Sequence, residues 1–203
     1  GAKFTTANLT YLNNVIVRNN STLGQGGGLF FWSTNANLFN VEVSNNEVPS
    51  RGGGIYLNDS DLIMTDIIIS ENRTMEGGDG YAGGGIFLYE SNPFLNNVTI
   101  NNNQSPAGFG GGIFSGYNSN PSFQSLLING NTALTGGGIA IIDSDAILSN
   151  TDIYNNSSDY NGGGMYVQSS STTLENVMFS ENSAGSKGGG VCLSIDTEIE
   201  LDR

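Results

Sequence analysis

The chain has 203 residues, a formal net charge of −13 and no histidine. Its acidity repels phosphate backbones, which excludes nucleic acid as a partner, and the lack of histidine excludes His-based triads, metal sites and general bases. A single cysteine allows neither an internal disulfide nor a Cys-rich zinc site, and no stretch approaches the roughly 18 apolar residues of a membrane-spanning helix.

A Gly-Gly-Gly triplet recurs through the whole chain and defines a repeat. The triplets begin at residues 26, 52, 83, 110, 136, 162 and 188, so most units are 26 residues long. Glycine at fixed positions is typical of a solenoid and not of a flexible linker. We expect each triplet to form a tight corner, because glycine allows backbone angles and close approaches that a Cβ forbids.

A short β-strand is predicted directly after each triplet. Apolar residues alternate there with period two, as where Ile55 and Leu57 flank Tyr56, and this alternation is typical of a strand with one buried face. The first apolar position of these strands is expected to line the core in every unit: Leu29, Ile55, Ile86, Ile113, Ile139, Met165 and Val191.

The residue that follows this first core position points outward and is aromatic in five of the seven units. Two interpretations of this ladder stay open. The rings of adjacent coils stack on one another and stiffen the sheet, or they form an open flat face that docks a glycan, a protein partner or another solenoid. The ladder positions are Phe30, Tyr56, Phe87, Phe114, Ala140, Tyr166 and Cys192.

A second strand follows in each unit and carries two ladders of polar residues. A small polar residue is followed six positions later by a second asparagine. Asparagine tolerates the left-handed conformation of a sharp bend, and stacked amides hydrogen-bond the neighbouring coils, so both ladders are predicted to be structural. The first contains Asn14, Asn40, Asn97, Asn150 and Asn176, and the second contains Asn20, Asn46, Asn72, Asn103, Asn131, Asn156 and Asn182.

Two corners are longer than the others. One unit has five extra residues within 73–82, and the next has one extra residue near 105–109. A scaffold tolerates functional loops at such places. Because the two units are neighbours in the stack, we expect their corners to bring Asp79, Tyr81 and Phe109 beside the aromatic ladder, and we place the candidate binding site there.

These features predict an all-β chain that folds as a parallel β-helix. Three short strands in about 26 residues form one coil, and coils stack about 4.8 Å apart. Residues 1–203 then form a single repeat domain of about seven to eight coils, right-handed as parallel crossovers generally are. Because the last coil reaches Leu201 without a cap, we expect a segment of a longer solenoid, or a subunit whose ends are covered by neighbours.

The chain also resembles a known repeat family. The sequence at 179–182, Phe-Ser-Glu-Asn, followed by Gly-Gly-Gly-Val at 188–191, is similar to the paired F-x-x-N and G-G-A-I motifs of polymorphic outer membrane protein repeats, known from chlamydial autotransporters. In the other units the first motif begins with Ile or Val, and the third glycine stands where the family has alanine. The resemblance implies a right-handed parallel β-helix passenger on a bacterial cell surface, often adhesive, with no catalytic residues.

A catalytic role is not predicted. The Asn-Thr-Asp sequence at 150–152 is similar to an acidic motif of polygalacturonases, which share the β-helix fold, but the paired aspartates, histidine and basic motif of that chemistry are missing. The pairs Asp59/Asp61 and Asp143/Asp145 lie in corresponding turns, where two interpretations stay open: solvated turn residues, which such pairs more often are, or weak Ca²⁺ ligands. We therefore expect no catalytic residue, no metal and no cofactor.

The leading functional hypothesis is an extracellular or cell-surface solenoid that acts as an adhesin or a structural scaffold. Its partner is then a glycan or protein on a host or neighbouring cell, or copies of itself. Two alternatives stay open: a subunit of an extracellular filament stacked end to end, and a fragment of a polysaccharide-active β-helix enzyme whose catalytic coils lie elsewhere.

Overall fold

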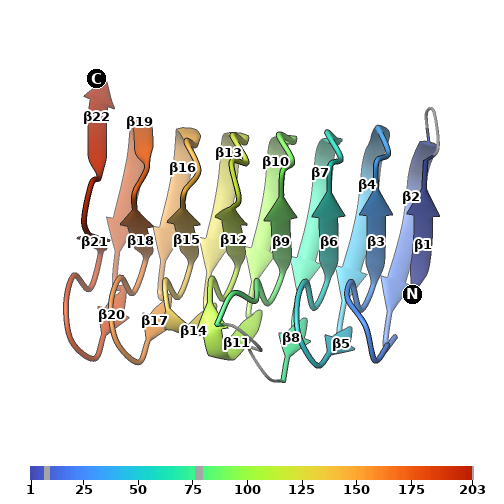
Figure 1. The fold of residues 1–203 in the computed structure, drawn as a ribbon, viewed down its shortest axis with the longest axis horizontal. Helices are drawn as coiled ribbons and strands as arrows, with labels where there is room; N and C mark the ends of the chain where they lie inside the picture. The colour runs from blue at the N-terminus through green and yellow to red at the C-terminus, as the bar shows by residue number, and fades with distance from the viewer. Residues whose placement is uncertain (7–9, 76–79, 203) are drawn as a thin grey trace.

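The computed structural model describes residues 1–6, 10–75 and 80–202. In these ranges the strands form three parallel sheets that run along the stack, and each coil enters the sheets in turn. Figure 1 shows the coils side by side from the blue N-terminal end to the red C-terminal end. The predicted parallel β-helix with three strands per coil is confirmed. No helix in the described ranges has the length and hydropathy needed to cross a membrane.

The first sheet contains the short strands that follow the glycine triplets. Its strands pair without a register shift, so that Ile55 lies opposite both Leu29 and Ile86. The eight strands are β1 (Ala2–Thr5), β3 (Leu29–Trp32), β6 (Ile55–Asn58), β9 (Ile86–Tyr89), β12 (Ile113–Gly116), β15 (Ile139–Ile142), β18 (Met165–Gln168) and β21 (Val191–Leu193).

The second sheet contains the long strands, and the third contains the short strands that lead to the next triplet. The eight long strands are β2 (Thr10–Arg18), β4 (Ala36–Ser44), β7 (Ile63–Ser70), β10 (Phe94–Asn101), β13 (Ser122–Asn129), β16 (Ile147–Tyr154), β19 (Ser171–Ser180) and β22 (Glu198–Asp202). The six strands of the third sheet are β5 (Glu47–Val48), β8 (Arg73–Thr74), β11 (Gln104–Phe109), β14 (Thr132–Thr135), β17 (Ser157–Ser158) and β20 (Ser183–Ala184).

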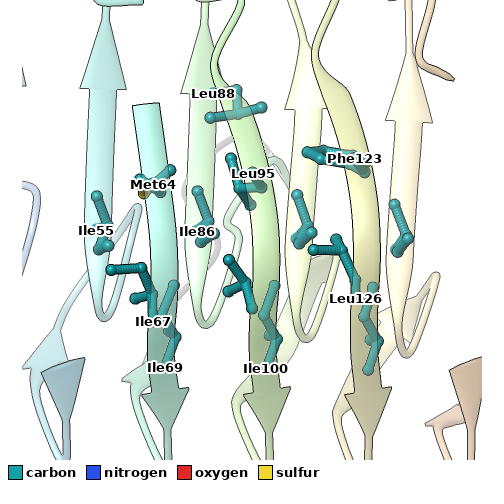
Figure 2. Packing of buried hydrophobic residues seen from close by; sticks show 14 of the residues in the cluster. Ile55, Met64, Ile67, Ile69, Ile86, Leu88, Leu95, Ile100, Phe123 and Leu126 are labelled. Atoms are coloured by element: carbon teal, nitrogen blue, oxygen red, sulfur yellow. The ribbon is translucent and has the colours of Figure 1, made fainter. Parts of the chain in front are cut away.

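One continuous apolar core fills the space inside the coils. Figure 2 shows Ile55 and Ile86 of the first sheet beside Met64 and Leu95 of the second, and all four side chains are fully buried. The same positions repeat in successive coils, so each core side chain packs on its equivalents above and below. A narrow core of this kind depends on every coil keeping the same register.

The glycine triplets form the tight corners that the sequence predicts. The first glycine of each triplet is left-handed, as at Gly52 with φ +66°. The second glycine has no room for a side chain, because the next coil is too close: a Cβ on Gly53 would lie 2.4 Å from the carbonyl oxygen of Gly84. Each triplet thus combines a sharp turn with close contact between coils.

Seven of the eight long strands, all but β22, bend at the first polar ladder. Asn14, Asn40 and Asn150 have φ values of 54°, 50° and 49°, and the equivalent residues of the other coils are left-handed as well: Asp66, Asn97, Ser125 and Asn176. The exposed side chains hydrogen-bond between coils, with Asn40 Nδ2 donating to Asn14 Oδ1 over 2.6 Å. The ladder therefore divides each of these seven strands into two halves that meet at an angle.

The second asparagine ladder is buried and connects the coils. Asn103 Oδ1 accepts hydrogen bonds from both the backbone N–H and the Nδ2 of Asn72, each over 3.0 Å. The left-handed residue at this corner is the one before the ladder asparagine, such as Asn102 with φ 54°. The ladder runs through Asn20, Asn46, Asn72, Asn103, Asn131, Asn156 and Asn182.

Candidate binding site

The second residue of each first-sheet strand stands on the outer face of that sheet. Along β3, β6, β9 and β12 this residue is aromatic, and the register pairs Phe30 with Tyr56, Tyr56 with Phe87, and Phe87 with Phe114. Their ring centroids are 5.1, 5.2 and 4.9 Å apart and the rings are stacked. Because neighbouring strands lie about 4.8 Å apart, the coil repeat itself brings the rings into contact.

The aromatic ladder is buried, so of the two interpretations that the sequence left open, the open aromatic face is wrong. Tyr56, Phe87 and Phe114 are 3%, 0% and 1% exposed, and Tyr166 is 7% exposed. Phe30, in the N-terminal part of the ladder, is half-buried. These residues form a second apolar cluster outside the first sheet. The stacking interpretation describes the structure, and the rings offer no platform to a large ligand.

The ladder is buried because chain segments outside the sheet cover it. Tyr81 and Phe109, from the corners before the glycine triplets, pack against the cluster. Tyr89 and Tyr117, from the ends of the first-sheet strands and the turns after them, pack against it as well, and the Tyr117 ring contacts that of Tyr81. The guanidinium carbon of Arg51 lies 5.2 Å from the Phe87 ring centroid. A cation over an aromatic face is attracted by the ring quadrupole, so this corner is held against the ladder electrostatically as well.

The structure brings the two longer corners together. Tyr81 and Phe109 form a parallel bridge, and their ring centroids are 5.6 Å apart. Tyr81 also lies 5.2 Å from Phe114. Asp79, the acidic residue predicted at this site, lies outside the described residues. The corners thus meet beside the ladder, and their aromatic side chains face the apolar cluster.

The longer corners also complete the ladder where it lacks a ring. Ala140 stands in register between Phe114 and Tyr166 and leaves that rung without an aromatic side chain. Phe109 approaches this region and lies 5.9 Å from Tyr166. We interpret the extra residue of this corner as the means by which Phe109 reaches the space beside Ala140. On this interpretation the extra residue serves packing.

The acidic pairs in the turns after the first sheet act as hydrogen-bond acceptors. Asp59 Oδ2 accepts from the Ser33 hydroxyl over 2.8 Å, and Asp61 Oδ1 accepts from the backbone N–H of Asn92 over 2.6 Å. Asp145 accepts from the N–H of Ser171 in the same way. The described residues contain no group of three or more His, Cys, Asp or Glu side chains that could hold a metal ion.

A ladder of hydroxyl groups was missed by the sequence reasoning. Ser60 Oγ accepts from the backbone N–H of Thr34 over 3.1 Å, and Ser91 Oγ accepts from the N–H of Ser60 over 3.0 Å. Ser119 Oγ accepts in the same way from Ser91, and Ser170 Oγ accepts from Ser144. Between these two pairs the pattern changes, because the Ser144 hydroxyl donates to the Ser119 carbonyl oxygen. Its signal is present in the sequence, since a Ser or Thr stands six or seven residues after the third glycine of each of the first six triplets.

Two family models match the chain. The model of a right-handed beta helix region matches residues 1–133 of the 203. The model of the Chlamydia polymorphic membrane protein repeat matches residues 176–194, which include the two motifs on which the resemblance was recognised. A search of curated proteins found no match to the chain.

Proposed function

We propose that this chain, a member of the right-handed beta helix family, is a surface-exposed solenoid. It serves as an adhesin or scaffold and carries out no catalysis. The match to a repeat of Chlamydia polymorphic membrane proteins points to a surface-associated, passenger-like protein. On this proposal the chain lies outside the cell, as part of a bacterial outer-membrane passenger, and presents its side faces to a partner on a host or neighbouring cell.

The observation that carries the proposal is the equivalence of the matched repeat to the other coils. Phe179 pairs with Ile153, and Asn156 donates to Asn182 Oδ1 as in the rest of the asparagine ladder. The matched segment therefore occupies the same structural position as its counterparts in earlier coils. The similarity to the polymorphic membrane protein repeat is found in one coil, but it thus applies to the architecture of the whole stack.

The proposed absence of catalysis is supported by what the polar side chains of the corners do. Asparagine, serine and aspartate side chains there bond neighbouring coils, as with Asn103, Ser91 and Asp61. Each of these groups stabilises the stack. Incubation with polygalacturonate, with and without Ca²⁺, is expected to release no reducing ends, and turnover in either condition would contradict this part of the proposal.

Adhesion is tested with coated beads. Latex beads that carry the chain are expected to bind epithelial or bacterial cells well above beads coated with albumin, and binding no better than albumin would refute the adhesive function. Electron microscopy of the same material is expected to show discrete short rods. Fibres that grow from the rod ends would instead favour an end-to-end filament.

A further inference from the structure

The first six coils of the second sheet expose a face that carries no charge. In the first six coils, the strand halves before the left-handed bend have two outward residues each, and none of these twelve is Asp, Glu, Lys or Arg, whereas the same row continues with Glu175 in the seventh coil. The strands pair without a register shift, so these residues form two straight rows across six coils. We call this surface the neutral face. It consists of the first and third residues of 11–13, 37–39, 63–65, 94–96, 122–124 and 147–149.

The neutral face combines large apolar side chains with polar groups that have no side-chain hydrogen bond to any residue that the structure describes. Its five large apolar residues are between 37% and 68% exposed: Tyr11, Phe39, Ile63, Phe94 and Ile147. Unlike the rings of the aromatic ladder, the Tyr11, Phe39 and Phe94 rings are not covered by a corner. The apolar side chains therefore form platforms that remain open to a ligand.

The polar residues of the same face differ from the other polar residues of the coils. Among the residues that the structure describes, no hydrogen bond joins the side chains of Asn37, Thr65 or Asn96 to the protein. A ladder asparagine such as Asn103, by contrast, uses both its amide oxygen and its amide nitrogen between coils. The donors and acceptors of the neutral face are thus available to a ligand.

A second copy of the chain does not fit this face well. The neutral face is six strands wide, at about 4.8 Å per strand, and four residues long, at about 3.3 Å per residue. Its area is therefore roughly 380 Å². Pairing two such faces buries about 760 Å² in total, below the roughly 1,200 Å² at which stable interfaces begin. The net charge of −13 opposes the approach of two copies as well. The same charge repels anionic polymers.

We propose that the neutral face binds an uncharged polysaccharide laid across the strands. The C–H faces of sugar rings pack on the platforms of Tyr11, Phe39 and Phe94, and the sugar hydroxyls hydrogen-bond the amide and hydroxyl groups between them. The six strands give a track of roughly 29 Å, which is long enough for several sugar units. This inference rests on the proposed adhesive function and names the chemistry of the partner.

The experiment measures binding of the full chain to three uncharged polymers, a soluble β-glucan, galactomannan and dextran, with polygalacturonate as the anionic control. Calorimetry is expected to detect binding to one or more of the uncharged polymers and none to polygalacturonate. The double variant Phe39→Ala/Phe94→Ala is expected to bind at least about tenfold more weakly. Circular dichroism shows whether the variant keeps its strands.

A matched control lies on the other half of the same sheet. Ile68 and Met178 are 48% and 52% exposed, similar to the two phenylalanines. The variant Ile68→Ala/Met178→Ala is expected to bind within about twofold of the native chain, because single exposed substitutions away from a site have small effects. Equal losses in the two double variants would overturn the assignment of the face.

Three further outcomes overturn the inference. They are an absence of binding to all three uncharged polymers, equal binding to polygalacturonate, and a dimer by light scattering that Phe39→Ala/Phe94→Ala dissociates. The last result would assign the face to a second copy. If coated beads still adhere to cells while the uncharged polymers do not bind, the polysaccharide inference fails and the adhesive function stands.

Discussion

The buried asparagine ladder provides a strong test of how the coils are held together. The side chain of Asn103 makes four hydrogen bonds of 2.9–3.0 Å: Oδ1 accepts from the backbone N–H and the Nδ2 of Asn72, and Nδ2 donates to the Ile69 carbonyl and to Asn131 Oδ1. The substitution Asn103→Ala removes all four and leaves the buried N–H of Asn72 without its acceptor.

The expected loss follows from these contacts. A typical hydrogen bond contributes about 1 kcal/mol net, and an orphaned buried group costs about 1–3 kcal/mol. We therefore expect the free energy of unfolding to fall by about 3–5 kcal/mol in Asn103→Ala. The matched control is Asn96→Ala, seven residues earlier on the neutral face, which is expected to change stability by less than about 0.5 kcal/mol.

Urea unfolding followed by far-ultraviolet circular dichroism measures the difference between the variants. Because repeat stacks can lose strict two-state behaviour, hydrogen exchange of the peptides around residue 103 accompanies it. Faster exchange is expected in the two coils that flank the substitution. A loss below about 1 kcal/mol for Asn103→Ala, or equal losses in the two variants, would refute the view that buried amides hold the coils in register.

Three other substitutions test separate parts of the fold. Gly137→Ala places a Cβ 2.4 Å from the Ser157 carbonyl oxygen and is expected to lower the thermal midpoint sharply or prevent folding. In the control Gly24→Ala, the atom nearest to the new Cβ is Thr22 Oγ1 at 3.8 Å, so the midpoint is expected to stay nearly unchanged. Phe87→Ala is expected to cost about 3–5 kcal/mol by urea unfolding, because this ring is fully buried; a cost below about 1 kcal/mol would contradict the second apolar cluster. Asn40→Val is expected to cost about 1–3 kcal/mol because φ is 50° there. Asn40→Gly is expected to cost less, because glycine accepts this φ and loses only the exposed hydrogen bond to Asn14; equal effects would argue against the left-handed bend.

The repeat made the fold predictable because every coil obeys the same constraints. A glycine corner, an apolar strand position and a buried asparagine must recur in each unit, so aligning the units exposes them. The burial of the aromatic ladder was not predictable in this way. Alternation places Tyr56 or Phe87 on the outer face of a strand, but it gives no information on whether another segment covers that face. Only the packing of Tyr81, Phe109 and the corner of Arg51 decides it.

The neutral face was missed for the opposite reason. Its apolar residues do not recur in every coil, since Ile63 and Phe94 share a row with Asn37 and Ser122. An alignment of repeats reports what all coils share, and what they share is what the stack needs for folding. A surface specific to some coils has no such periodicity and becomes visible only when the register is known.

The most direct test of the account measures distances between equivalent positions in different coils. One row of the second sheet contains Asn13, Gln124 and Glu175. Gln124 lies four coils from Asn13, and Glu175 lies six coils from it. With Cys192 replaced by serine, pulsed electron resonance between spin labels at 13 and 124, and at 13 and 175, is expected to give separations of roughly 19 and 29 Å. Separations that do not grow in proportion to the number of coils would contradict the in-register stack.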